Sequence, residues 1–267
     1  LLDNGELDWS VINPDIFGSM IQAVVDTNQR SGLGMHYTSV PNIMKVIEPL
    51  FLNELKEELE NTNKYKLKAK HEKLGKLHDR ISKIKFFDPA CGSGNFLIIA
   101  YKELRNLEIE LIKRFNQLDG IPSRIYLHNF YGIEIDDFAH EIATLSLWLA
   151  EHQMNMAFKA EFGFCAPALP LKDSGNIVCA NACRIDWEQV CPKQPEDEIY
   201  ILGNPPYLGA RYQEPSHRDD IQFLLSNWNG CKSLDYITCW FYKGSHYIKQ
   251  SQNKLAFVST NSICQGE

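Results

Sequence analysis

The positions of apolar residues indicate a helical first third of the chain. Residues 15–26 and 41–60 place apolar side chains three or four positions apart, which is the spacing of one face of an α-helix. Pro41 suits the first turn of the second helix, because proline lacks the N–H that this turn leaves unbonded. We therefore predict an N-terminal helical segment over residues 1–83, with a glycine-bearing loop at residues 30–39.

Short apolar runs alternate with helical patterns from residue 84 onward. The strand candidates are residues 84–88, 129–135, 176–181, 198–204 and 254–260, and the helix candidates are residues 95–115, 137–154, 219–228 and 234–250. This alternation is typical of an α/β fold with a mostly parallel sheet and helices on both faces. We predict such a core over residues 84–267. Ligands of these sheets bind beyond the carboxyl ends of the strands, so the residues directly after each strand are the candidates for chemistry.

Composition and charge limit the class of protein. The 267 residues are 44% hydrophobic and 23% charged, which is typical of a globular chain. Neither a secretory signal nor an apolar run of about 20 residues, the length that crosses a bilayer, is recognisable. We expect a soluble, cytoplasmic protein. The net charge of −7 argues against a general polyanion binder, so DNA contacts would be local or would come from residues outside this chain.

The cysteines and one basic stretch add little to the prediction of function. The eight cysteines are scattered without a CxxC pair, so we expect reduced thiols and predict no metal site. Residues 64–85 carry nine Lys or Arg against two acids. This stretch is either a solvated helix face, the commoner case, or a surface that contacts phosphates.

A glycine loop follows the first predicted strand. In "DPACGSGNFL", Gly92 and Gly94 allow a tight turn and a close approach of backbone to ligand, and the helix that begins near Asn95 offers free N–H groups. Asp88 stands at the tip of the strand and is an acceptor. It suits a ligand with an ammonium group better than a pyrophosphate.

Acceptors also follow the second and third strands. Glu134 ends "YGIE" and is placed to take both hydroxyl groups of a ribose. It lies 42 residues after Gly92, against about 20 in a dinucleotide fold, and the long intervening helix accounts for the difference. In "CANACRIDW", Asn181 either accepts a hydrogen bond from the amine of a purine, with Ala182 against the ring, or forms a simple turn.

The fourth strand runs into "GNPPY". Pro205 and Pro206 cannot donate to a strand ladder, so they end the strand and stiffen the backbone. A backbone carbonyl and the Asn204 side chain then converge as two acceptors on one amino group, while Tyr207 offers a flat face to the ring that carries it. Accepting both N–H bonds frees the nitrogen lone pair for attack, which is a form of electrostatic preorganisation.

Together these motifs resemble the S-adenosylmethionine-dependent DNA methyltransferases that act on amino groups, and in particular the N6-adenine enzymes whose cofactor motif precedes the catalytic motif. "GMHYTS" resembles the motif that lies before the first strand in this subgroup and closes over the methionine end of the cofactor. "DPACGSG", "GIEID", "CANA" and "GNPPY" resemble the glycine loop, ribose acid, adenine contact and catalytic motif, and "KLAFVSTNS" a later core strand. The arrangement is similar to that of the large single-chain restriction-modification enzymes of the MmeI type.

The resemblance implies a Rossmann-like class I methyltransferase fold, and it implies roles for named residues. The cofactor contacts would come from Tyr37, Thr38, Asp88, Ala90, Gly92, Gly94, Asn95, Phe96, Glu134, Ile135, Asn181 and Ala182, and the catalytic residues would be Asn204, Pro205, Pro206 and Tyr207. The partner would be double-stranded DNA with its target adenine flipped out of the helix. The region that recognises the DNA sequence would follow Glu267, so the resemblance implies a catalytic core without it.

Other functions fit parts of the same pattern. Asn-Pro-Pro-Tyr also serves methyl transfer to a protein glutamine amide or to a guanine amine in RNA, since each presents a planar NH2 group. A non-catalytic module that binds cofactor or DNA is a further alternative, although it has no need of paired acceptors. A dinucleotide-dependent oxidoreductase is disfavoured because Leu97 stands in place of a third glycine. A nuclease built on Pro14, Asp15 and residues 54–56 is disfavoured because both parts lie in helical patterns.

Overall fold

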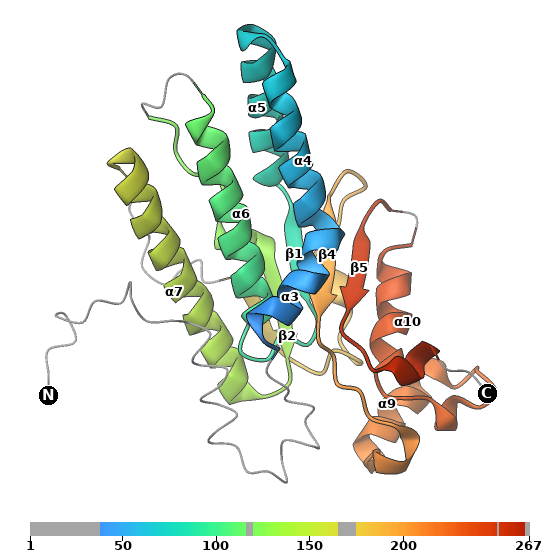
Figure 1. Ribbon diagram of the computed structural model, residues 1–267. Helices are drawn as coiled ribbons and strands as arrows, with labels where there is room; N and C mark the ends of the chain where they lie inside the picture. The colour runs from blue at the N-terminus through green and yellow to red at the C-terminus, as the bar shows by residue number, and fades with distance from the viewer. Residues whose placement is uncertain (1–37, 116–119, 165–174, 250, 265–267) are drawn as a thin grey trace, which may run out of the picture.

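The computed structural model describes residues 38–115, 120–164, 175–249 and 251–264. Its centre is a sheet of five parallel strands in the order β3–β2–β1–β4–β5 (Figure 1). The strands are β1 (Lys85–Asp88), β2 (Phe130–Glu134), β3 (Asn176–Cys179), β4 (Ile199–Gly203) and β5 (Lys254–Phe257). The predicted α/β class with a parallel sheet is confirmed. The helix predicted over residues 15–26, most of the loop at 30–39 and Tyr37 lie outside the described residues.

Helices cover both faces of the sheet (Figure 1). One face carries α3 (Val40–Ile47), the π-helical turn η3 (Glu48–Leu52), α4 (Asn53–Asn61), α5 (Leu67–Ile81), α6 (Asn95–Lys113) and α7 (Asp137–Phe162). The other face carries α8 (Trp187–Val190), α9 (Pro215–Leu225) and α10 (Thr238–Tyr247). Short 3-10 turns are η4 (Thr62–Lys64), η5 (Leu127–Asn129), η6 (Ala210–Tyr212), η7 (Cys231–Ser233) and η8 (Asn261–Cys264).

Alternation along the strands builds two hydrophobic cores. Phe86 on β1 and Tyr200 on β4 pack against the helices of the first face, while Phe87 and Ile201, their neighbours in sequence, pack against α8 to α10. This follows from the period of two in a β-strand, which sends successive side chains to opposite faces. Because both faces are covered, the strands read as continuous apolar runs.

The N-terminal helices share a core with the sheet. The ring of Phe51 in η3 lies 4.9 Å from that of Phe86 and 5.2 Å from that of Tyr200, measured between centroids. Ile43 and Leu55, on α3 and α4, are fully buried in the same cluster. The helical segment therefore packs directly on the sheet, and the division of the chain at residue 83 stays a prediction.

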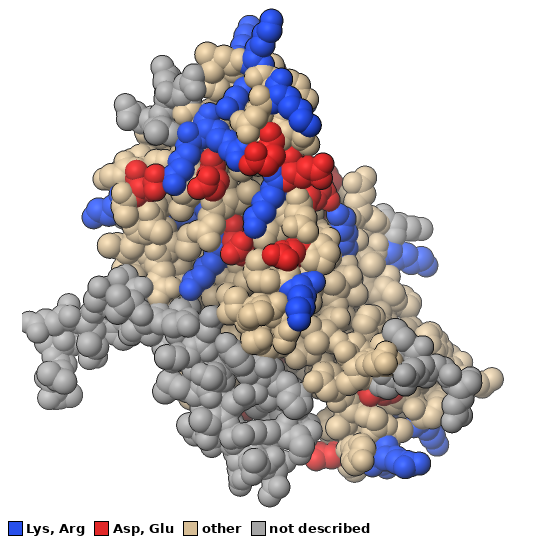
Figure 2. Space-filling view, viewed as in Figure 1, with Lys and Arg blue, Asp and Glu red and all other residues tan. Residues whose placement is uncertain are grey.

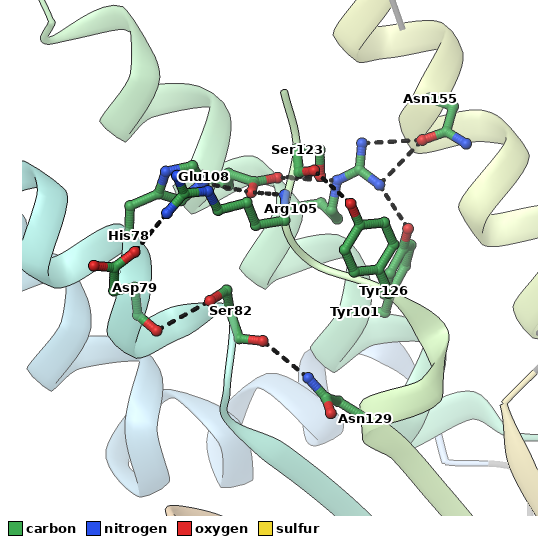
Figure 3. A network of polar contacts seen from close by, with 11 residues as sticks. His78, Asp79, Ser82, Tyr101, Arg105, Glu108, Ser123, Tyr126, Asn129 and Asn155 are labelled. Atoms are coloured by element: carbon green, nitrogen blue, oxygen red, sulfur yellow. Dashed lines mark hydrogen bonds and ion pairs between the residues drawn. The ribbon is translucent and has the colours of Figure 1, made fainter. Parts of the chain in front are cut away.

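A buried ionic network joins α5 and α6 (Figure 3). Glu108 of α6 is fully buried and accepts hydrogen bonds from Ser123 Oγ at 2.5 Å and from the backbone N–H of Arg124 at 2.7 Å. His78 Nε2 of α5 lies 2.9 Å from the same carboxylate, and Arg105 Nε lies 3.4 Å from it. A buried carboxylate is tolerated when it is paired and hydrogen-bonded in this way, and the network fixes α5 against α6.

The basic stretch forms η4 and α5. Lys64, Lys66 and Lys68 are exposed where α4 turns into α5, and Figure 2 shows basic side chains gathered at this tip. The tip lies at the opposite end of the molecule from the carboxyl ends of the strands (Figure 1). Both interpretations of the stretch, a solvated face and a phosphate contact, stay open. Among the described residues, no helix is both long and apolar enough to span a membrane.

Candidate active site

The glycine loop connects the central strand to α6. The carboxylate Oδ1 of Asp88, at the tip of β1, accepts a hydrogen bond from the N–H of Ala90 at 3.0 Å. Gly94 precedes the first residue of α6 with φ of 85°, and Gly92 has φ of 54°. Residues with a side chain rarely adopt these left-handed backbone conformations, which explains why glycine occupies both positions. The loop thus brings the start of α6 to the carboxyl edge of the sheet.

Glu134 ties the tip of β2 to this loop. One carboxylate oxygen accepts the N–H of Gly92 at 2.8 Å, and the other accepts the N–H groups of Ile135 and Asp136, both at 2.9 Å. Burial raises the pKa of Glu134, and the three backbone hydrogen bonds lower it in part. The carboxylate is therefore oriented by backbone before any ligand binds.

Asp88 is buried beside the end of β4. Gly203 has φ of 150°, and a Cβ atom at this position would lie 2.4 Å from Asp88 Oδ1, so only glycine fits there. The other carboxylate oxygen of Asp88, Oδ2, is buried and has no hydrogen-bond partner among the described residues. Burial raises the pKa of Asp88 to about 8, and the negative charge of Glu134 adds to the rise.

Asn204 follows Gly203 and is oriented by a residue far away in the sequence. Its Nδ2 donates to Oγ1 of Thr38 at 3.0 Å, across 166 positions of the chain. The structure thereby brings Thr38 of the "HYTS" motif to Asn204 of the "NPPY" motif. The amide oxygen Oδ1 of Asn204 is buried and has no partner among the described residues.

The loop after the two prolines is held rigidly. Pro205 is buried, and Pro206 and Tyr207 are half-buried. Leu208, the next residue, donates its N–H to Oδ1 of Asp235 at 2.8 Å and accepts the N–H of Tyr236 at 3.1 Å. Two hydrogen bonds thus anchor the backbone that follows Asn-Pro-Pro-Tyr to the segment at Asp235 and Tyr236.

Three buried acceptors without partners fall at residues predicted for the site. They are Oδ2 of Asp88, Oδ1 of Asn95 at the start of α6, and Oδ1 of Asn204. Buried polar atoms in native proteins are almost always hydrogen-bonded, so such atoms point to a ligand that supplies donors. An ammonium group at Asp88 and an amino group at Asn204 would supply them, and the residues present therefore fit S-adenosylmethionine and an amine acceptor.

Comparisons with known proteins place the chain in a family. Residues 62–267 match the family model described as the DNA-methyltransferase domain of MmeI. The chain belongs to this family. It is 55% identical, over its full length, to DNA methyltransferase A of Bacillus subtilis (strain 168), of which it covers 30%.

Solved structures agree with this assignment. The type IIL restriction-modification enzyme MmeI, determined in complex with DNA, is similar over 98% of this chain with 43% identity and a TM-score of 0.86. The DrdV–DNA complex is similar over 94% of the chain, with 16% identity and a TM-score of 0.52, which supports the fold alone. The chain covers 35% of the MmeI chain and 23% of the DrdV chain, so it spans about a third or less of these proteins.

Other predicted cofactor residues of this family member lie in varied settings. Phe96 and Ala182 are buried in the two cores, whereas Ile135, next to Glu134 in the sequence, is 56% exposed. Oδ1 of Asn181 accepts the N–H of Cys183 at 2.8 Å, which is the turn that the sequence offered as an alternative. The roles assigned to these residues stay predictions.

Several residues that shape the site carry no signal in the sequence. Trp240 of α10 donates its indole N–H to the carbonyl of Pro89 at 2.9 Å and so anchors the start of the glycine loop to α10. Gln213 Nε2 bonds the carbonyls of Leu208 and Leu234, both at 2.8 Å. These contacts join distant segments, so no local spacing announces them. Gly203 is the exception, because a glycine at the end of an apolar strand indicates a close approach.

Possible metal ligands gather elsewhere. Among the described residues, one group of three such side chains has its ligand atoms within 4.8 Å of one another, namely Asp137, His140 and Glu141 at the start of α7. His140 Nε2 already lies 3.3 Å from the carbonyl of Ile177, and the two acids are exposed. We assign no metal to this group.

Proposed function

We propose that this chain is the catalytic core of a DNA methyltransferase that transfers a methyl group from S-adenosylmethionine to N6 of adenine. The observation that carries the proposal is the pair of buried, unpartnered acceptors at adjacent strand tips, Oδ2 of Asp88 and Oδ1 of Asn204. β1 and β4 are neighbours, and the connection after β1 leads outward to β2 whereas the connection after β4 leads in the opposite direction to β5. Ligands of open α/β sheets bind at such a switch point.

The cofactor side of the proposal rests on the first two strands. Asp88 would accept from the ammonium group of the methionine part, and Glu134 would accept from the ribose hydroxyls while it keeps its backbone bonds. Asn181 and Ile135 would lie against the adenine. When bound, S-adenosylmethionine supplies a methyl group on a positively charged sulfur, which is open to attack by a nucleophile.

The acceptor side rests on the tip of β4. Oδ1 of Asn204 and a backbone carbonyl of the proline pair would accept the two N–H bonds of the adenine amine. The amine nitrogen then carries a localised lone pair and would attack the methyl carbon in line while the carbon–sulfur bond breaks, so that neutral S-adenosylhomocysteine leaves and the amine gives up one proton to water. Thr38 holds the amide in the orientation that this requires. Tyr207 would stack on the flipped base, a contact worth about 1 to 3 kcal/mol.

The core would act as part of a longer enzyme. The chain spans 30% of its Bacillus subtilis relative and 35% of MmeI, so a region that recognises the DNA sequence would lie in the remainder. The net charge of −7 agrees with this division, because DNA affinity depends on cationic contacts. We expect the whole protein to be in the cytoplasm, together with the DNA, as one part of a restriction-modification system.

The test is methyl transfer by the full-length protein. Tritiated S-adenosylmethionine is offered with DNA, ribosomal RNA or a glutamine-containing release-factor peptide, and digested DNA is examined for N6-methyladenine. Incorporation into DNA as N6-methyladenine is expected. Label found only in RNA or only in the peptide would instead support methyl transfer to a guanine amine or to a glutamine amide. If the protein neither transfers methyl groups nor binds the cofactor, a non-catalytic module would be the remaining alternative.

Asn204→Ala separates the acceptor site from the cofactor site. This change removes one of the two amine acceptors and should abolish detectable methyl transfer, while calorimetry finds cofactor affinity nearly unchanged. A loss of cofactor affinity in this variant would contradict the role proposed for Asn204.

A further inference from the structure

Asp220 on α9 is a buried carboxylate outside every motif that the sequence analysis selected. Oδ1 accepts Nε of Arg184 at 2.5 Å, and Oδ2 accepts Nδ2 of Asn181 at 2.9 Å and the hydroxyl of Tyr236 at 2.7 Å. A buried carboxylate needs several donors to offset the loss of water, and hydrogen bonds to an ionised acceptor are roughly twice as strong as neutral ones. Asp220 therefore gathers three donors from two other segments of the chain.

One of these segments is the predicted adenine contact. The amide of Asn181 is fixed at both ends, because its Oδ1 accepts the N–H of Cys183 and its Nδ2 donates to Asp220. Its orientation is therefore set, and it can still offer a ligand the second lone pair of Oδ1 and the second N–H of Nδ2. A carboxylate at position 181 would have no N–H to donate to Asp220, and its negative charge would repel that of Asp220.

The other segment reaches the catalytic loop. Burial raises the pKa of the Tyr236 phenol, so its hydroxyl stays protonated and donates to Asp220. The backbone N–H of Tyr236 donates to the carbonyl of Leu208, the residue after Tyr207. A short chain of hydrogen bonds thus runs from the catalytic loop through Tyr236 and Asp220 to Asn181.

We propose that Asp220 is a positioning residue for both substrates: it fixes the Asn181 amide for the adenine of the cofactor and, through Tyr236, the loop that follows Asn-Pro-Pro-Tyr. The inference rests on the proposed function for the identity of the ligands, and it adds a residue that no motif contains. Arg184 covers the outer side, with its guanidinium 4.4 Å from the ring centroid of Phe223. Asp220 acts through these neighbours and touches neither substrate itself.

The first experiment compares two acids that adjoin on the same helix, in the full-length protein. Asp220→Asn removes the charge that holds Asn181 and should weaken affinity for S-adenosylhomocysteine about tenfold to a hundredfold, the range for a lost hydrogen bond to a charged group. Asp219→Asn makes the same chemical change at an exposed position and should leave affinity unchanged. Tyr236→Phe should lower the methylation rate at saturating cofactor more than it lowers cofactor affinity. Equal affinities for the Asp220→Asn and Asp219→Asn variants would overturn the inference.

The second experiment exchanges the two polar groups. Asn181→Asp alone places two carboxylates together in place of a donor and an acceptor, so it should bind the cofactor more weakly than wild type. The double variant Asn181→Asp/Asp220→Asn restores one donor and one acceptor, so its affinity should recover to within a few-fold of wild type. A general loss of folding would not recover in this way. A double variant no better than the worse single variant would refute the positioning role.

The wild-type protein serves as the reference that separates this inference from the proposed function. If wild type methylates DNA while the Asp220→Asn variant behaves like it, the positioning role fails and the function stands. If wild type methylates no DNA, the proposed function fails, and the binding comparison still decides whether Asp220 orders the cofactor pocket.

Discussion

At the scale of single residues, the site depends on polar atoms that the fold holds in place without satisfying them. Asn204 offers a buried amide oxygen while its N–H donates to Thr38, and Asp88 offers a carboxylate oxygen because only one of its two oxygens meets a backbone N–H. Each unpaired atom costs stability in the absence of ligand. In the proposed function a ligand supplies the donors, so these residues would favour ligand binding at the expense of the stability of the free protein.

Thr38 should affect the chemical step more than cofactor binding. Thr38→Val keeps the shape of the side chain but removes the hydroxyl that accepts from Asn204, so the amide loses its fixed orientation. We expect methylation by the full-length protein to slow roughly fivefold to a hundredfold, the range for a lost buried hydrogen bond, with the Kd for S-adenosylhomocysteine within about threefold. Thr38→Ser keeps the hydroxyl and should retain the rate. Weaker cofactor binding with an unchanged rate would instead assign Thr38 to the cofactor alone.

Asp88 should make cofactor affinity depend on pH. Its pKa of about 8 leaves the carboxyl largely protonated at pH 6, whereas an ammonium group pairs with the ionised form. Binding must then release a proton, so affinity for S-adenosylhomocysteine should rise with pH between 6 and 8, by up to about tenfold per unit. Calorimetry in buffers of different ionisation enthalpy measures the released protons. Asp88→Asn should lose this dependence, the exposed control Asp137→Asn should keep it, and a flat wild-type profile would contradict the assignment.

The same carboxyl should lower the stability of the free protein. Folding raises the pKa of Asp88 from its ordinary 3.8 to about 8, so the folded state binds the proton more tightly than the unfolded state. The contribution to stability is thus greatest below pH 4 and is lost as the pH rises to 8. Asp88→Asn should therefore unfold at a higher temperature than wild type at pH 8, although it binds the cofactor less well.

At the scale of elements, local patterns predicted the strands and helices but not all their ends. The five strands were predictable because each is an apolar run bounded by polar residues. The helix predicted over 137–154 continues to residue 162, where Gly163 ends it with φ of 79°. The helix predicted over 234–250 begins only at Thr238, because Asp235 and Tyr236 bind the backbone of Leu208. That contact joins distant segments, and no local periodicity reports it.

The candidate residues of the site were predictable from their positions at the ends of strands, and their partners were not. Asp88 and Asn204 occupy strand tips, and parallel strands bring such tips to one edge. The contacts between Thr38 and Asn204 and between Asn181 and Asp220 span 166 and 39 positions. Such pairs depend on the assembled fold, which places loops from different strands side by side.

The junction of β1 and β4 should tolerate no side chain at Gly203. Gly203→Ala places a Cβ atom only 2.4 Å from Oδ1 of Asp88, and the backbone keeps a φ of 150° that alanine rarely adopts. We expect a loss of stability of roughly 1 to 3 kcal/mol and a clear loss of cofactor affinity, followed by thermal unfolding and calorimetry. Gly209→Ala is the matched control, since its Cβ would meet nothing within 4 Å. Equal behaviour of the two variants would show that the contact with Asp88 is unimportant.

At the scale of the whole molecule, the two activities of the proposed enzyme should be separable. All the described residues proposed for the cofactor lie on one sheet edge within this chain, whereas a net charge of −7 gives it little attraction for a polyanion. The exposed lysines at the tip of α5 lie far from that edge (Figure 1) and cannot hold a base beside Asn204. Cofactor binding should therefore belong to residues 1–267, and productive DNA binding to the longer protein.

This division gives a direct comparison of residues 1–267 with the full-length protein. The shorter chain should bind S-adenosylhomocysteine with a Kd within a few-fold of the full-length value, because residues 1–267 contain every residue proposed to contact the cofactor. The shorter chain should methylate DNA at least about a hundredfold more slowly at 100 mM salt. Cationic contacts supply most of the affinity for DNA, and we expect these contacts in the rest of the longer protein. Lowering the salt should recover part of the rate, because weaker screening helps the few cations that remain. Equal DNA methylation by the two proteins would mean that these residues alone contain the whole DNA site.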